Sequence, residues 1–208
     1  MKFASVLAGR CALLATASLS LAAFLVLASL AARQHWFDVD HSVRQLIGAT
    51  RHPMLDTPMW GFSLLGDRLG LIPLIALTSA ALWPGHRRWA LALPVIMAGT
   101  GGLQLLAKWA VDRPRPNLAE WGFPSGHVLA LVVFFGVIAY LLCTARAGWG
   151  CRRVGAGVAG VTVLIVAFSR LYLDAHWLSD VAGGFVLGLA YLLLTIWLVE
   201  SLSRRRAQ

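Results

Sequence analysis

The sequence has few acidic residues and few cysteines, and neither set forms a recognisable metal site. Nine Asp and Glu residues are spread over 208 positions, without a cluster of carboxylates at the spacing of a two-metal centre. Cys11, Cys143 and Cys151 have neither zinc-ligand spacing nor the pattern of a disulfide framework. Low-complexity linkers and internal repeats are also missing. The chain therefore indicates one domain over residues 1–208, with no metal and no other cofactor implied.

Charge is nearly absent from six long apolar stretches. They lie at about residues 11–32, 69–84, 89–107, 127–145, 154–168 and 181–199. A helix that crosses a bilayer needs roughly 20 apolar residues. The second and fifth stretches are short, but residues 60–65 and 171–173 can extend them. A soluble chain of this size has no room for six helices without a polar face. We therefore predict an all-α integral membrane bundle of six transmembrane helices.

The first apolar stretch can also be compared with a signal peptide. Its length exceeds the usual apolar core of about 7–15 residues in such peptides. We therefore expect a retained helix rather than a cleaved segment.

The net charge of +9 is distributed unevenly over this six-span arrangement. One side carries ten Lys and Arg residues and one acid, and the other carries eight of each sign. An excess of cations on one side is typical of cytoplasmic loops. We therefore expect a multi-pass protein of a bacterial-type inner membrane, with both termini cytoplasmic. The charge gives no reason to expect nucleic acid, and nothing indicates an obligate protein partner.

A long outside segment, residues 33–68, separates the first two stretches. Asp40 is placed to cap a short helix with one apolar face, and Pro53 is placed to end it. One interpretation is an amphipathic segment that lies on the membrane. The other is a wall or gate beside the site where a lipid tail enters. On the last span, Gly183, Gly184 and Gly188 are typical of close helix packing.

Two other outside segments hold a set of residues suited to binding a phosphate. Lys108, Arg115 and Arg170 supply three positive charges, and Ser125 and Gly126 begin a helix. An arginine fork binds two phosphate oxygens, and lysine adds a point charge. The free backbone N–H groups at a helix start also favour an anion.

Two histidines accompany this cradle. His176 and Asp180 are four residues apart and share one helix face, so the carboxylate can hold one ring nitrogen and leave the other free. His127 reaches the same place from another helix. Such a pair suits in-line phosphoryl transfer, in which one histidine attacks phosphorus and the other protonates the leaving oxygen.

Three motifs in this region occur together and in order. They are Lys108, six residues and Arg115-Pro116; Pro124-Ser125-Gly126-His127; and Ser169-Arg170, five residues, His176, three residues and Asp180. This pattern, within residues 108–180, resembles the three-part signature of the type 2 phosphatidic acid phosphatase superfamily. The membrane members of that superfamily are six-helix lipid phosphatases, so the resemblance extends over about the whole chain.

The resemblance implies a role for each matched residue. His176 would be the nucleophile that forms a phosphohistidine, Asp180 would orient it, and His127 would be the general acid. The phosphate-binding residues would be Lys108, Arg115, Ser125, Gly126 and Arg170. Two residues are left open. Arg113 is a candidate headgroup contact, and Asp174 would either tune headgroup preference or hold a neighbouring cation.

The function expected from these residues is metal-independent hydrolysis of a lipid phosphate at the outer face of the inner membrane. Candidate substrates are polyprenyl diphosphate, phosphatidylglycerol phosphate, phosphatidic acid and lipid A phosphates. The loop of residues 117–123 is short, which favours a simple headgroup, with polyprenyl diphosphate slightly ahead. A phosphotransferase that uses a lipid acceptor such as lipid A is an alternative. A non-catalytic transporter or binder of anionic lipid is another, although the intact His176, Asp180 and His127 speak against it.

Overall fold

The computed structural model describes residues 2–33, 37–144 and 148–205, which form eight helices. Their bounds are α1 (Lys2–Ala32), α2 (Asp38–Ala49), α3 (Pro53–Leu64), α4 (Arg68–Leu82), α5 (Arg87–Val111), α6 (Gly126–Thr144), α7 (Trp149–Tyr172) and α8 (Leu178–Arg205). The predicted all-α class is therefore confirmed.

Five of these helices are long and apolar enough to cross a membrane alone, and there are six candidate spans if one bent pair counts as a span. With 15 residues, α4 is about 22 Å long, which is short of a bilayer core of about 30 Å. Together α3 and α4 pass the same test, with a bend of 45° between them. Counted as one span, the pair contains the predicted extension over residues 60–65.

The bend between α3 and α4 has a local cause. Asp67 ends the turn as the N-cap of α4, and its Oδ1 accepts a hydrogen bond from the Leu69 backbone at 3.2 Å. Gly70 lets the chain fold tightly here, because a Cβ at this position would lie 2.2 Å from the Leu64 carbonyl oxygen. The bend places residues 63–67 beside the start of α6.

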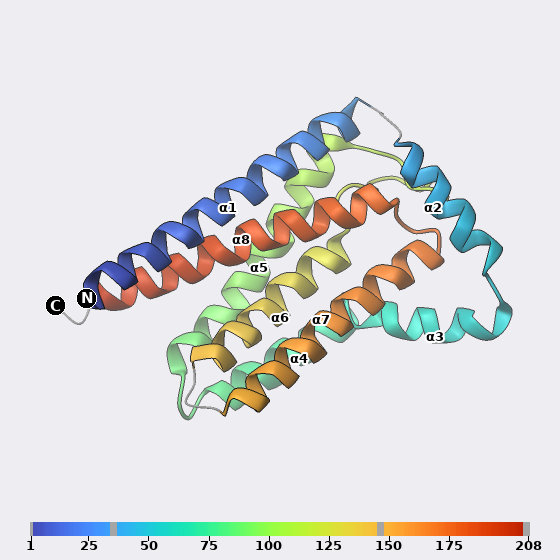
Figure 1. Cartoon of the computed structure of the whole chain (residues 1–208). Helices are drawn as coiled ribbons and strands as arrows, with labels where there is room; N and C mark the ends of the chain where they lie inside the picture. The colour runs from blue at the N-terminus through green and yellow to red at the C-terminus, as the bar shows by residue number, and fades with distance from the viewer. Residues whose placement is uncertain (1, 34–36, 145–147, 206–208) are drawn as a thin grey trace.

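The most apolar helix, α6, lies in the middle of the bundle and packs against α5, α7 and α8 (Figure 1). Leu131, Val133 and Val137 on α6 are fully buried, together with Leu93 of α5 and Val166 of α7. On the outside of the bundle, α1 runs along α8 and α4 packs on α5. Large apolar side chains that remain exposed on these outer helices suit contact with lipid tails.

Small residues on α8 bring it close to α6. A Cβ on Gly184 would lie 2.5 Å from the Ser125 carbonyl oxygen, and one on Gly188 would lie 3.0 Å from that of Leu129. At Gly183 the neighbour is the Phe123 ring, at 2.4 Å. The predicted close packing is therefore present, and it fixes the start of α6 relative to α8.

The outside segment differs from its predicted details. Asp40 does not cap α2, which begins at Asp38 after Phe37, because the Asp40 side chain is buried in other contacts. Pro53 does not end that helix either. It is the first residue of α3, where the missing N–H of proline costs nothing. Both α2 and α3 pack against the end of α7, and α2 also contacts α8 (Figure 1), so this segment forms a wall of the bundle. Residues 34–36 lie outside the described part.

Candidate active site

The three polar motifs meet at one end of the bundle. Local structure explains how each arrives there. Lys108 lies in the last turn of α5, Gly126 begins α6, Arg170 lies in the last turn of α7 and Asp180 lies in the first turn of α8. Asp112 adopts a left-handed conformation (φ 44°), which Asp tolerates better than most residues, and ends α5. The adjacent ends of four helices therefore surround one space.

His176 lies in the short connection between α7 and α8 and is only 3% exposed. Its Nδ1 is 3.5 Å from Oδ2 of Asp180, which is an ion-pair distance longer than an ordinary hydrogen bond, and Nδ1 has no hydrogen-bond partner among the described residues. The same Oδ2 accepts the Trp177 backbone N–H at 3.0 Å, and Oδ1 accepts Arg113 Nη1 at 2.9 Å. Asp180 is thus held by several donors. With Nδ1 facing this carboxylate, Nε2 is the nitrogen left for a substrate.

The surroundings of His176 favour its neutral form. Burial lowers the pKa of this imidazole well below its ordinary value, and the positive charges of Arg170, Lys108 and Arg115 lower it further. A neutral imidazole keeps a lone pair on one nitrogen, which a nucleophile requires.

The three predicted phosphate-binding cations line one cavity with both histidines. Lys108 and Arg170 are buried, at 5% and 7% exposed, and Arg115 is half-buried. Lys108 Nζ donates to the Trp121 carbonyl oxygen, and Arg170 Nη1 donates to Ser63 Oγ. The Nε atoms of Arg115 and Arg170 are buried without a hydrogen-bond partner among the described residues. Buried donors of this kind are costly unless something accepts from them, so the cluster suits an anion.

The start of α6 contributes to the same cluster. Gly126 lines the cavity, and a Cβ there would overlap the Gln104 side chain at 2.2 Å. Ser125 is fully buried behind it and is not among the lining residues. Its Oγ lacks a hydrogen-bond partner within the described part of the chain. Its backbone N–H donates to the Asp180 carbonyl oxygen at 2.9 Å, which ties the two motifs together.

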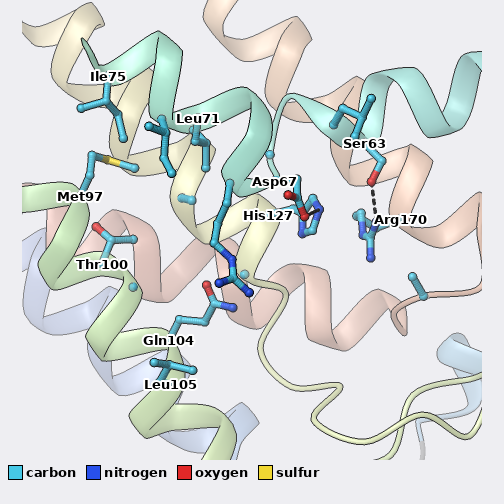
Figure 2. A pocket seen from close by; sticks show the side chains of 18 of the residues that line it. Ser63, Asp67, Leu71, Ile75, Met97, Thr100, Gln104, Leu105, His127 and Arg170 are labelled. Atoms are coloured by element: carbon cyan, nitrogen blue, oxygen red, sulfur yellow. Dashed lines mark hydrogen bonds and ion pairs between the residues drawn. The ribbon is translucent and has the colours of Figure 1, made fainter. Parts of the chain in front are cut away.

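His127 faces the bend between α3 and α4. Its Nε2 lies 3.9 Å from Asp67 Oδ2. Gly66 permits this approach, because a Cβ there would lie 2.8 Å from the Cβ of His127. Figure 2 shows His127 beside Asp67, with Arg170 bonded to Ser63 nearby. The bend thus supplies polar partners to two residues of the predicted site.

The cavity has a volume of about 1030 Å³ and extends from His176 between α4 and α5. At one end it is lined by the cations and histidines. At the other end the lining is apolar and includes Leu71, Ile75 and Met97 (Figure 2). A cavity with one charged end and one apolar end fits a molecule with the same division.

The sequence suggested Arg113 as a candidate headgroup contact, but the structure places it elsewhere. Its side chain is fully buried and forms ion pairs with Asp40 at 3.0 Å and with Asp180 at 2.9 Å. Buried charges require such partners because leaving water is costly. The two Arg-Pro pairs at residues 113–116 are a visible signal in the sequence, but they do not show which arginine faces inwards.

Asp174 holds neighbouring cations, which is one of its two predicted alternatives. Its carboxylate accepts two hydrogen bonds from Arg44, at 2.8 and 2.7 Å, and lies 3.4 Å from Arg51 Nη2. Arg51 Nε also donates to the Tyr172 carbonyl oxygen at 2.9 Å. These contacts attach α2 to the connection between α7 and α8. Sequence reasoning did not find these partners, nor Ser63, Asp67 and Ser179.

Comparison with protein families gives a match to the PAP2 superfamily over residues 89–204. The chain belongs to this superfamily. The match covers more than half of the chain and includes all three motifs. The resemblance inferred from those motifs is therefore confirmed, and the protein is a multi-pass membrane lipid phosphatase that hydrolyses phosphoric monoesters.

Relatives with described activities support the same assignment. Phosphatidylglycerophosphatase B of Bacillus subtilis (strain 168) is 31% identical over 192 residues, which are 88% of this chain and 94% of that protein. The putative undecaprenyl-diphosphatase YbjG of Escherichia coli (strain K12) is 27% identical over 71% of this chain and 76% of its own length.

Solved structures agree on the fold. The crystal structure of the transmembrane PAP2-type phosphatidylglycerolphosphate phosphatase from Bacillus subtilis has a TM-score of 0.80 at 28% identity, covering 89% of this chain and 96% of that one. The structure of Aquifex aeolicus LpxE has a TM-score of 0.62 at 20% identity, covering 77% and 96%, and shows likeness of fold alone.

Proposed function

We propose that the protein removes a terminal phosphate from a membrane lipid through a phosphohistidine on His176. Nε2 of His176 forms a bond to phosphorus while the bond to the lipid oxygen breaks, and His127 gives that oxygen its proton. Water then attacks the phosphohistidine, returns a proton to His127 and releases inorganic phosphate. The observation that carries this proposal is a buried imidazole in one cavity with three cations, two of which have unpaired Nε atoms among the described residues. Burial and these cations lower the pKa of the imidazole, which favours its neutral form.

Charge neutralisation in this reaction falls to the protein. Lys108, Arg115 and Arg170 bind the phosphate oxygens, and the backbone at Gly126 supports them. The hydroxyl of Ser125 lies outside the cavity lining, so its predicted contact with the phosphate requires a small movement at the start of α6. Within the described residues, no group of three or more His, Cys, Asp or Glu side chains is placed to hold a metal ion. The reaction is therefore proposed to be metal-independent, which EDTA treatment tests directly.

Phosphatidylglycerol phosphate is the substrate that we propose first. The phosphatidylglycerophosphatase of Bacillus subtilis resembles this chain over nearly the whole length of both proteins. Polyprenyl diphosphate is the second candidate, supported by the similarity to YbjG and by the short loop of residues 117–123, which leaves little protein above the headgroup. In both cases the apolar end of the cavity, at Leu71, Ile75 and Met97, suits the lipid tail.

We place the cavity at the outer face of the inner membrane. The end of the bundle opposite the cavity carries the described members of the ten-cation side, which the positive-inside rule assigns to the cytoplasm. The first described residue of α1 and the last described residue of α8 lie at that opposite end (Figure 1), so both termini are cytoplasmic in this arrangement.

The test is phosphate release by the purified protein in detergent with EDTA present. Substrates are phosphatidylglycerol phosphate, polyprenyl diphosphate, phosphatidic acid and a lipid A phosphate, each with wild type and His176→Ala. We expect release to be strongest from phosphatidylglycerol phosphate, to resist EDTA and to be lost in the variant. Loss of phosphate from the substrate only when a lipid acceptor is added, with that phosphate recovered on the acceptor, would replace hydrolysis by phosphotransfer. Lipid binding without either reaction would favour a binder.

A further inference from the structure

The outside helix α2 sends a carboxylate into the protein next to the catalytic motifs. Asp40 is 1% exposed, although it lies in the first turn of a largely exposed helix. Its Oδ1 accepts the Ser179 backbone N–H at 2.8 Å, and its Oδ2 accepts Ser179 Oγ at 2.6 Å. The same Oδ2 accepts Arg113 Nη2 at 3.0 Å. A surface residue would not be desolvated in this way without a compensating role.

Arg113 connects this carboxylate to a second one. Its Nη2 binds Asp40, and its Nη1 binds Asp180 Oδ1 at 2.9 Å and Ser179 Oγ at 2.6 Å. The side chains of all three charged residues are 0% exposed. A guanidinium is planar and holds its donors in a fixed fork, so the position of one carboxylate constrains the other. Asp180 cannot turn away without breaking an ion pair that is anchored on α2.

The network ends on the imidazole. Asp180 uses Oδ1 for Arg113 and faces Nδ1 of His176 with Oδ2. Asp40 and His176 also line one small void of about 10 Å³, so the two side chains lie close together. The order of contacts is therefore Asp40, Arg113, Asp180 and His176, and it crosses from α2 to α8.

We infer that Asp40 and Arg113 are positioning residues that hold Asp180, and through it His176, in the geometry for attack. The inference rests on the proposed phosphohistidine reaction. Neither residue lines the large cavity, so neither touches the substrate. Losing the network should therefore lower kcat and leave KM nearly unchanged.

The structure offers a matched pair of variants on α2. Asp40→Asn keeps the size of the side chain and removes its charge. Asp38→Asn makes the same change on an exposed residue of the same helix, two positions earlier. Contacts of Arg44 and Arg51 with Asp174 hold α2 in place independently of Asp40. We expect Asp40→Asn to lower kcat about 10- to 100-fold, since small misplacements of a reacting group cost this much, and Asp38→Asn to remain near wild type.

A double-mutant cycle separates positioning from general destabilisation. If Asp40 acts through Asp180, adding Asp40→Asn to Asp180→Asn will lower kcat by less than about threefold. Full multiplication of the two losses, or wild-type kcat in Asp40→Asn, would overturn the inference. Arg113→Lys, which keeps the charge but cannot bridge both carboxylates, should give the same kcat loss if Asp40→Asn does not fold. Wild-type kcat in this variant would also overturn the inference.

Failure of the underlying reaction has a different signature. If the proposed function is wrong, wild type releases no phosphate or His176→Ala retains activity. If only the positioning network is wrong, wild type is active, His176→Ala is inactive and Asp40→Asn behaves like Asp38→Asn.

Discussion

The site has two walls that come from different parts of the chain. The motif wall, residues 108–180, carries every group proposed to touch the phosphate. The N-terminal wall, made of Asp40, Ser63, Gly66 and Asp67, carries no motif. Yet its polar side chains reach the motif wall, because Asp40 contacts Arg113 and Ser179, Ser63 contacts Arg170, and Asp67 faces His127. The motif wall thus carries the groups proposed to perform the chemistry, and the N-terminal wall carries groups that hold them in position.

The largest difference in kcat/KM between variants of the two walls should appear at Arg170 and its partner Ser63. Arg170→Ala removes a charge from the phosphate cradle and should lower kcat/KM by about 100-fold or more. Ser63→Ala removes only an acceptor for one N–H group and should lower it about tenfold or less. Steady-state phosphate release measures both. Equal losses would mean that the two walls contribute alike to binding the transition state.

The next largest effect is expected from a packing change behind the motif wall. In Gly184→Ala, the new Cβ would approach the Ser125 carbonyl oxygen to 2.5 Å, so backbone must shift. Overpacking of this kind costs about 1–3 kcal/mol, and moving Ser125 should lower activity as well. The control is Gly160→Ala on α7, where a Cβ meets nothing within 4 Å. Thermal unfolding in detergent compares them, and equal stability would contradict the close contact of α6 and α8.

A smaller effect is expected at Asp67. Asp67→Asn preserves the helix cap, since Asn caps as well as Asp, and removes only the charge 3.9 Å from His127. The Asp67 side chain is 45% exposed, so solvent screens it and kcat should fall only about two- to fivefold. Glu120→Gln, on an exposed loop residue, serves as the control. A loss beyond 100-fold at Asp67, measured as kcat, would make this acid a direct participant.

The smallest effect is expected where α2 meets Asp174. Arg44→Ala breaks an ion pair of 2.7 Å whose arginine is 42% exposed. Such pairs contribute up to about 1 kcal/mol, so the melting temperature should fall by only a few degrees and kcat should remain unchanged. A kcat loss as large as that of Asp40→Asn would show that clamping α2 matters as much as its buried carboxylate.

The fold was largely predictable from the sequence because a bilayer imposes a simple rule. Each span needs a long apolar stretch, and the six stretches appear as α1, the α3–α4 pair and α5 to α8. Two spans with short apolar cores required neighbouring residues, and both extensions were predicted. The motif wall was predictable for a related reason. The three motifs lie at the ends of neighbouring spans on the same side of the bundle, so their polar side chains have few ways to be placed other than together.

The N-terminal wall was not predictable in the same way. Asp40 reads as a helix cap because capping is local, whereas its burial depends on Arg113 and Ser179, more than 70 residues away in the chain. Arg113 reads as an exposed cation because two Arg-Pro pairs look alike without their surroundings. Ser63 and Asp67 acquire meaning only through the bend that brings them to α6. Contacts of this range leave no periodic signal in a single sequence.

The most direct test of the account is to locate the phosphorus covalently bound to the protein during turnover. The protein would be mixed with phosphatidylglycerol phosphate carrying a labelled terminal phosphate, quenched in base to preserve phosphohistidine, digested and mapped. If His176 is the nucleophile, acid-labile label will be found on the peptide that contains His176 and will be absent from His176→Ala. Label on another residue, or normal turnover by His176→Ala without any label, would contradict it.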